Sequence, residues 1–421
     1  MTASEPTMTE PWFICNARLP GSPGLWRIGI AGAHIASVQP QDDAGARDLG
    51  PSWDAAGRLV SPAFVDSHLH LDKCLTSQRS PGTARNLDEA IRAVRAIKAG
   101  FTVADVAERG RRALRMGVQH GTVWARSNCE VDRSAGFRAL EGLQQAGREM
   151  AAQVGLQLIA FPQEGWFDTP GTLEDGAGPF VAASLERGVK VIGGNVNGAL
   201  WPSQPQDQVD ATFALAAKHD CDIDYHLDNA DVPHAFTLPY VAEKVIAQGW
   251  QGRVAVSHIA SLAQVSDAQA AQTIDRLRAA DISVCVLPTR IRLTRVMALM
   301  EAGVNVACGT DNLRDPFVRF GDADPLKALL LLAQLTFNLS DAGLERLWAT
   351  ATTNAARMLR LKHYGLAPGC AADLMVIDAP SAAQAILQQS PRLAVFKAGV
   401  QVAGPLSLHS TPTFQSSIRR P

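Results

Sequence analysis

Two histidines one residue apart, His68 and His70, are the first residues of this chain whose spacing points to chemistry. They follow five apolar or small residues at 61–65, and on a strand both side chains would project from one face. Such a pair is either a polar strand edge or half of a metal site, since neutral imidazole is a common metal ligand. The spacing alone leaves both interpretations open.

Further histidines, acids and amides follow other apolar runs of strand length. Eight such runs recur between residues 61 and 311, separated by longer stretches such as 267–280 with helix-period apolar spacing. This alternation predicts an α/β fold, a closed parallel (β/α)8 barrel with its active site at the carboxyl ends of the strands. The stretch 71–120 is expected to hold two helices and a loop over the barrel mouth. The polar residues expected at the strand ends are His68, His70, Arg126, Asn128, Gln163, Glu164, Asn195, Asn197, His226, Asp228, His258 and Asp311.

This set of residues favours a metal site over a merely polar barrel rim. Four of the chain's ten histidines fall at predicted strand ends, and an acid closes the last strand. Three imidazoles and one carboxylate suit Zn²⁺ or Fe²⁺ and leave one position for water.

The two ends of the chain have a different sequence pattern from the barrel region. Residues 1–60 and the segment after 362 read as short strands with glycine turns, which together would complete one small β unit. We therefore predict two domains, one built from 1–60 plus 365–421 and a barrel over 61–364.

Composition and charge restrict the class of protein. The 421 residues are 47% hydrophobic and 19% charged, which favours a large core, and the net charge of −2 gives no footprint for nucleic acid or an anionic membrane. No apolar run is long enough to span a bilayer, and no signal peptide is evident. Seven scattered cysteines without a CxxC pair predict reduced thiols and a cytoplasmic location.

Several motifs resemble the amidohydrolase superfamily along nearly the whole chain. They are "SPAFVDSHLHLDK", "SHIAS" and "CGTDNLRDPF", while "IAFPQEGWF" resembles the cytosine deaminase branch, and Lys73 with "DIDYH" resembles its N-isopropylammelide amidohydrolase group. The resemblance implies that the flanking β segments form a composite sandwich domain. It also implies His68, His70, His226 and Asp311 as metal ligands, His258 next to the attacking water, and Gln163 on the substrate ring.

The same resemblance predicts how many metal ions the site holds and shows where this sequence departs from the family pattern. Some members hold two metals through a lysine at the end of strand 4, but Lys190 lies at the other end, so one divalent ion, zinc or iron, is expected. Asn229 stands where cytosine-type deaminases carry a proton-shuttling glutamate, and an amide cannot transfer a proton in that way. The proton donors that remain are Asp311, His258, Asp228 and Lys73.

Three further residues each have two possible roles. We expect Lys73 to contact a substrate carbonyl or an anionic ring, the alternative being a solvated lysine. Asp228 is either an anchor behind the site or a substrate contact. Trp166 is either part of the core or a surface on which a planar ring stacks.

The sequence thus predicts a mononuclear metal-dependent hydrolase, a deaminase or alkylamino-hydrolase acting on a small heterocycle such as a pyrimidine, purine, pterin or triazine. Asp311 and His258 would be its catalytic residues. Hydrolytic opening of a cyclic amide or ester is the alternative, and a non-catalytic binding protein is a third possibility. The expected partners are the small substrate and further copies of the chain, with neither nucleic acid nor membrane.

Overall fold

The chain folds into two compact units in a computed structural model. One unit is Met1–Ala63 with His363–Pro421, and the other is Phe64–Lys362. The sequence put the corresponding boundaries at 60/61 and 364/365, within a few residues of these positions. The structure describes residues 11–41, 51–80, 84, 86–167, 176–196, 205–229, 236–289 and 292–406.

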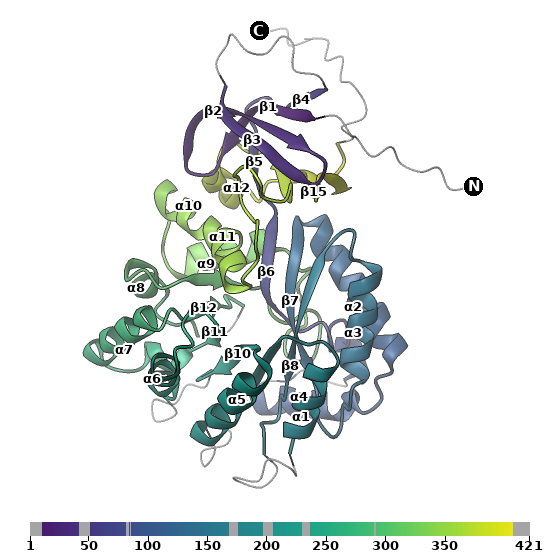
Figure 1. Cartoon of the computed structure of the whole chain (residues 1–421), viewed down its shortest axis with the longest axis vertical. Helices are drawn as coiled ribbons and strands as arrows, with labels where there is room; N and C mark the ends of the chain where they lie inside the picture. Colours follow the sequence, from purple (N-terminus) through teal and green to yellow (C-terminus); the bar gives the residue numbers. More distant parts are fainter. Residues whose placement is uncertain are drawn as a thin grey trace. The chain divides into compact units, whose positions relative to one another are not determined.

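The larger unit is built on one sheet of eight parallel strands (Figure 1). A backbone bridge between Leu69 and Asp311 brings the end of the last strand against the first, so the sheet forms a nearly closed barrel. The predicted (β/α)8 barrel is therefore confirmed. In sheet order the strands are β6 (Phe64–Leu69), β7 (Thr122–Glu130), β8 (Gly155–Phe161), β9 (Val191–Val196), β10 (Asp222–Leu227), β11 (Val254–His258), β12 (Ser283–Val286) and β13 (Val306–Cys308).

Helices surround the barrel strands (Figure 1). The stretch 71–120 holds two of them, α1 and α2, as predicted. Helix α2 begins where Thr102 accepts a hydrogen bond from the Asp105 amide, and it buries an apolar face that includes Val106 and Leu114. The bounds are α1 (Leu87–Lys98), α2 (Val103–Gln119), α3 (Arg138–Glu149), α4 (Gly178–Glu186), α5 (Pro205–His219), α6 (Leu238–Gln248), α7 (Asp267–Ala279), α8 (Val296–Glu301), α9 (Pro325–Leu335), α10 (Asp341–Thr350) and α11 (Thr353–Met358), with 3-10 turns η1 (Ser77–Arg79) and η3 (Ala260–Ala263).

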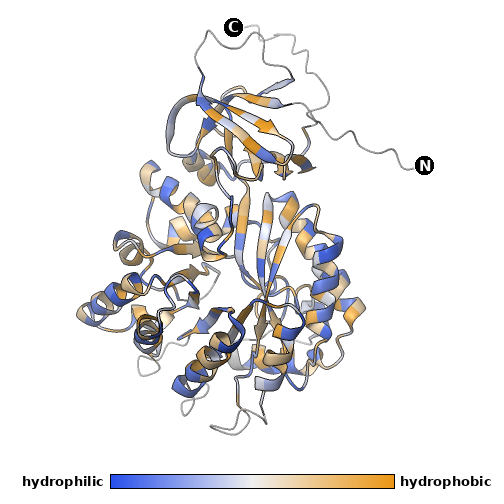
Figure 2. Cartoon of the chain, in the orientation of Figure 1, coloured by the Kyte–Doolittle hydropathy of each residue, from blue (hydrophilic) through white to orange (hydrophobic). Residues whose placement is uncertain are grey.

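Hydropathy follows this architecture (Figure 2). The outer helices mix hydrophilic and hydrophobic residues, as expected of helices with one buried face. The parallel strands are buried along most of their length, so polar residues on them stand out against an apolar background.

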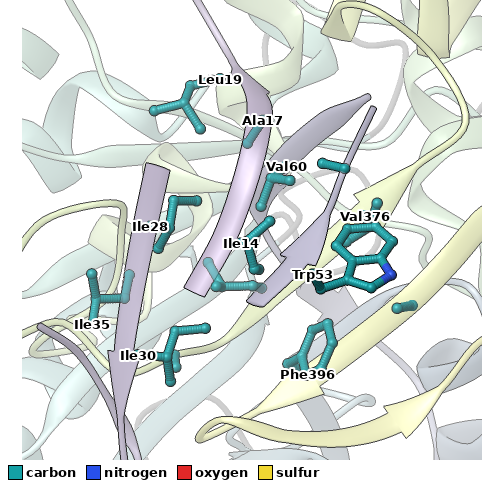
Figure 3. Close-up of a cluster of buried hydrophobic side chains, with 14 residues drawn as sticks. Ile14, Ala17, Leu19, Ile28, Ile30, Ile35, Trp53, Val60, Val376 and Phe396 are labelled. Carbon is teal, nitrogen blue, oxygen red and sulfur yellow. The ribbon is translucent and has the colours of Figure 1, made fainter. Parts of the chain in front are cut away.

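The smaller unit combines strands from both chain ends in one largely antiparallel sheet. Its β5 pairs with β14, which joins the N-terminal and C-terminal segments. Ile14, Ile28, Trp53, Val376 and Phe396 share its apolar core (Figure 3). The elements are β1 (Trp12–Leu19), β2 (Ser22–Ala31), β3 (His34–Pro40), β4 (Ser52–Asp54), β5 (Leu59–Pro62), β14 (Leu374–Ile377), β15 (Arg392–Lys397), β16 (Val400–Ala403) and α12 (Ala382–Gln388).

The first predicted barrel strand is in fact two strands. The apolar run from Ser61 to His70 divides at Ala63, so that β5 belongs to the small unit and β6 to the barrel. Pro62 lies at the division, where its missing N–H cannot continue a ladder. An uninterrupted apolar run cannot by itself reveal that its halves join different sheets.

Two other sequence expectations concern membranes and thiols. Across the described residues, no helix is both long and apolar enough to span a membrane. All seven cysteines are free, and five of them are buried.

Candidate metal centre

Three imidazoles converge at the carboxyl ends of β6 and β10. His68 lies in β6, His70 directly follows it, and His226 lies in β10. One ring nitrogen from each lies within 4.8 Å of the others, and Nε2 of His70 is 3.0 Å from Nε2 of His226. Two nitrogens bound to one tetrahedral zinc at about 2.0–2.1 Å would be about 3.3 Å apart. The three histidines are buried and fit a shared metal ion.

Asp311 faces this triad with a fully buried carboxylate. Its Oδ1 lies 3.5 Å from Nε2 of His70 and 3.7 Å from Nε2 of His68. Its backbone adopts a left-handed conformation, with φ of 66°, and its N–H donates to the carbonyl of His68 across 2.9 Å. Such a conformation costs free energy in a non-glycine residue and is typical of functional sites. The donor set thus combines three imidazoles with one carboxylate.

Asp66 holds the segment that carries Asp311 against β6. Its carboxylate accepts hydrogen bonds from the N–H of Thr310, at 3.1 Å, and from the Thr310 hydroxyl, at 2.6 Å. Burial raises the pKa of Asp66 to about 6, although the Thr310 bonds act in the opposite direction. These bonds orient the residue that immediately precedes Asp311.

The orientation of the His68 ring is set by its neighbours. Its Nδ1 lies 2.9 Å from the hydroxyl of Ser257, which leaves Nε2 directed toward Asp311. Asn128, on β7, places its amide nitrogen 3.2 Å from the carbonyl oxygen of Leu69 and 3.4 Å from Nε2 of His68. The Ser257 contact, to the ring nitrogen that faces away from Asp311, is of the kind that fixes the ring position of a metal-ligating histidine.

His258 and Phe161 complete the walls around the triad. His258 ends β11 in a left-handed conformation, with φ of 72°, and its ring centroid is 4.9 Å from that of His226. Phe161 ends β8, and its ring centroid is 4.4 Å from that of His226. His258 is therefore beside the triad, and Phe161 gives the site one apolar side.

Lys73 lies in a buried network that the HxH motif alone does not suggest. Its ammonium donates to Oε1 of Glu130 across 2.7 Å and to Oε1 of Gln163 across 3.1 Å. Burial alone would lower the pKa of Lys73, but the carboxylates of Glu130 and Asp72 outweigh it and raise the pKa above its usual value. Lys73 is thus a buried, charged lysine and not a solvated one.

Lys98, at the end of α1, extends the same network. It donates to Glu130 Oε2 at 3.1 Å, to Asp132 at 2.7 Å and to Glu164 at 2.7 Å. Glu130 therefore bridges two lysines, one through each oxygen, and their charges hold its pKa low despite its burial. The network joins α1 to the ends of β7 and β8, beside Gln163.

Glu130 and Lys98 are not among the residues predicted from the sequence. The prediction that Arg126 ends a strand is wrong, because β7 continues to Glu130 and Arg126 lies in mid-strand with Nη1 3.0 Å from Asp224. The alternation of a strand puts residues 126, 128 and 130 on one face, which was the available signal. No sequence pattern links Lys98, which is 32 residues from Glu130, to this site.

Asp228 caps a helix. Its Oδ2 accepts hydrogen bonds from the N–H groups of Thr237 and Leu238, both at 2.8 Å, at the start of α6. Burial raises its pKa to about 7 against the effect of these bonds. The sequence left Asp228 as either an anchor behind the site or a substrate contact, and these contacts are those of an anchor. Asn229 follows it and is half-buried.

Trp166 is packed into the barrel wall. It is fully buried, and its indole N–H donates to the carbonyl of Gly193 across 3.2 Å. A Cβ on Gly194 would come within 2.7 Å of the indole nitrogen, so this glycine makes room for the ring. These contacts are those of a core residue. Asn197, also expected near the site, lies outside the described residues.

Comparison with known proteins agrees with this geometry. Residues 53–159 and 144–403 match the family model described as Amidohydrolase family. The chain is 31% identical to N-isopropylammelide isopropyl amidohydrolase of Pseudomonas sp. (strain ADP) over 395 residues, 92% of this chain and 96% of the relative. It is 29% identical to pterin deaminase of Rhizobium rhizogenes over 384 residues, 86% of this chain and 84% of the relative.

The fold is also similar to a solved structure. The crystal structure of 5-methylcytosine deaminase from Klebsiella pneumoniae with 5-fluorocytosine matches with a TM-score of 0.86 and 27% identity. The match covers 94% of this chain and 98% of that chain, and so extends over both units.

Proposed function

Because the chain belongs to the amidohydrolase family and is a hydrolase of carbon–nitrogen bonds, we propose that it removes an amino or alkylamino group from a small nitrogen heterocycle with a single metal ion. The observation that carries this proposal is the convergence of His68, His70 and His226 within 4.8 Å. The carboxylate of Asp311 faces two of these rings, which completes a donor set suited to zinc or iron.

The catalytic residues we propose are Asp311 and His258. The three histidines and Asp311 would hold a divalent ion, which would supply Lewis acidity and lower the pKa of water bound there. Asp311 accepts the proton of the attacking water and returns it to the leaving nitrogen. His258, beside His226 and His68, orients the water and stabilises the developing negative charge.

Lys73 and Gln163 would bind the substrate. The Lys73 ammonium and the Gln163 amide nitrogen are both donors, so together they favour a substrate edge that carries acceptors, such as a carbonyl oxygen or an anionic ring nitrogen. The named relatives act on N-isopropylammelide, pterin and 5-methylcytosine, which are all nitrogen heterocycles. Asp228 would support this pocket through α6, and Trp166 through the barrel wall.

Asn229 shapes the range of substrates that we propose. Without a carboxyl group at that position, the leaving nitrogen must be protonated through Asp311 and His258. This favours rings already protonated at the reacting nitrogen, or leaving amines that are basic. Cytosine needs protonation of its ring to become a good electrophile, and we therefore expect it to be a poor substrate.

A substrate panel tests the proposal. Metal-loaded protein is incubated with pyrimidines, purines, pterins, triazines and hydantoins, and both amine release and ring absorbance are followed. We expect stoichiometric ammonia or alkylamine from at least one ring. Loss of ring absorbance without amine would establish ring opening instead, and absence of turnover on the whole panel would contradict the proposal.

Variants at Asn229 test the specificity argument. Asn229→Glu should keep the metal and either gain cytosine deamination or lose activity on the best panel substrate through charge repulsion. Asn229→Ala is the control for a residue that merely caps a loop. Efficient cytosine turnover by the wild type would contradict the argument. Equal activities of the wild type, Asn229→Glu and Asn229→Ala on both substrates would contradict it as well.

Location and assembly are also part of the proposal. Seven free cysteines support a reducing, cytoplasmic compartment. Leu331, Leu335, Phe337 and Leu339 expose large apolar side chains at the end of α9, which supports a homo-oligomer. Sedimentation of the metal-loaded protein measures the oligomeric state, and a monomer at micromolar concentration would contradict the proposed homo-oligomer.

A further inference from the structure

A cavity of about 680 Å³ lies between α3 and the amino-terminal end of β8, away from the metal centre. Its walls include the start of β8 (155–158) and the turn that leads into β9 (187–191). Both segments lie at the amino ends of the strands, whereas Phe161 and His226 lie at the carboxyl ends. The volume is in the range of small-molecule sites, roughly 300–1,000 Å³. We call it the amino-end cavity.

The cavity lies beside a stretch of β8 that has no partner on β9, because β9 begins only at Val191. These strands pair only at Ile159 with Val191 and Ala160 with Ile192. On its other edge, β8 pairs with β7 from Gly155 onward. The first four residues of β8 therefore border the cavity, and Leu156, Gln157 and Leu158 are only partly buried.

Cationic side chains dominate the polar lining of this cavity. The side chains that line it include Arg126, Arg148, Arg187 and Lys190, against one acid, Asp222. Asp222 is already paired, 3.0 Å from Arg253 and 2.6 Å from Arg360. The net charge of the side chains that line the cavity is therefore positive.

The four cations differ in what already contacts them. Arg126 is buried at the back, 3.0 Å from Asp224, and is the one most fully compensated. Arg187 stacks on Phe137 with its guanidinium carbon 3.9 Å from the ring centroid. Within the described part of the chain, the Arg148 and Lys190 side chains make neither a hydrogen bond nor an ion pair.

The remaining lining is largely aliphatic. Leu143, Leu156, Leu158, Val189 and Val191 all border the cavity. We propose that the amino-end cavity binds a small organic anion, its charged end against Arg148, Arg187 and Lys190 and its apolar part against these side chains. This site is separate from the metal centre and does not depend on the proposed hydrolysis.

Matched probes test this site by calorimetry on the full-length, metal-loaded protein. Naphthalene-2-sulfonate carries both features, 2-naphthol has no charge at neutral pH, and inorganic sulfate has no apolar part. We expect one sulfonate per chain, bound at least tenfold more tightly than either of the other two. Equal affinity for the sulfonate and 2-naphthol, or for the sulfonate and sulfate, would overturn the proposal.

Substitutions then locate the bound probe. Arg148→Ala and Lys190→Ala should each weaken the sulfonate roughly fivefold, since each removes about 1 kcal/mol from an exposed ion pair. Arg346→Ala, an exposed arginine on α10, is the matched control and should change nothing. Sulfonate that binds to the metal centre instead would be insensitive to both variants, which would overturn the proposal.

The two proposals fail independently of each other. Calorimetry needs no turnover, so an inactive protein with a filled amino-end cavity would contradict only the hydrolase proposal. Because Arg148 and Lys190 are exposed, their alanine variants should keep the wild-type melting temperature and the activity on the best panel substrate. A variant that keeps both while losing the sulfonate supports the cavity alone.

Discussion

The ammonium of Lys73 lies 3.1 Å from Oε1 of Gln163 and fixes the direction of that amide. An ammonium can only donate, so the atom that faces it must be the oxygen. The amide nitrogen is then the group of Gln163 that remains to donate to a ligand. Asn195 holds the Gln163 backbone as well, through a 3.2 Å bond to its carbonyl.

Gln163→Ala should weaken transition-state binding without changing the metal content. Loss of one hydrogen bond to a polarised substrate costs roughly 1–3 kcal/mol, or about 5- to 150-fold in kcat/KM. Steady-state kinetics with elemental analysis measures both quantities. Gln334→Ala, at an exposed position on α9, is the control. An unchanged kcat/KM would remove Gln163 from the substrate site.

The metal centre should hold about one divalent ion per chain, because His68, His70 and His226 with Asp311 form one set of four donors among the described residues. Elemental analysis of protein grown with zinc, iron or manganese measures this number. His226→Ala should lose the ion, and removal by a chelator should abolish activity that zinc or iron restores. Two ions per chain, or none after supplementation, would overturn the assignment.

Asp311→Asn should reduce turnover by at least ~10³ while the substrate still binds, because an amide cannot accept the proton of the attacking water. Single-turnover kinetics and equilibrium binding of the best substrate separate these effects. Metal content is measured alongside, so that loss of a ligand is distinguished from loss of a base. Near-normal turnover would exclude the role.

Glu130→Gln should destabilise the barrel and reduce activity together. Glu130 bridges Lys73 and Lys98 in the interior, so its neutralisation removes the one carboxylate that the two buried lysines share, at a cost of roughly 3–5 kcal/mol. Urea unfolding measures the cost. Glu108→Gln, which removes an exposed partner of Arg111, should cost less than about 1 kcal/mol. Equal effects of the two substitutions would show that the network contributes little.

Asp105 should stabilise the fold in a pH-dependent way. Its hydrogen bond with Arg79, and next that with Arg109, lower its pKa to about 2 against the effect of burial. A lowered pKa in the folded state means that the contribution is complete above about pH 5 and disappears as the pH falls from 4 toward 2. Asp105→Asn should therefore cost about 1 kcal/mol at pH 7, allowing for solvent screening, and much less at pH 3. Urea unfolding of metal-free protein at both values measures this, and a pH-independent difference would contradict it.

The sequence alone determined the barrel and the candidate ligands. Apolar runs of strand length alternate with helix-period stretches, so eight strands and their order follow from local pattern. Because the carboxyl ends of parallel strands share one rim, the strand pattern places four histidines and Asp311 together, and the resemblance to amidohydrolases implies which three histidines are ligands. The strands and their polar ends are properties of period and spacing, which a single chain displays directly.

Only the tertiary structure decided the contacts between distant side chains. The bridge of Glu130 to Lys73 and Lys98 depends on the length of β7 and the path of α1, and the helix cap at Asp228 depends on where α6 begins. The unpaired start of β8, beside which the amino-end cavity lies, depends on the register of β8 and β9. Burial, charge pairing and register are set by residues far apart in sequence, and for that reason local pattern does not contain them.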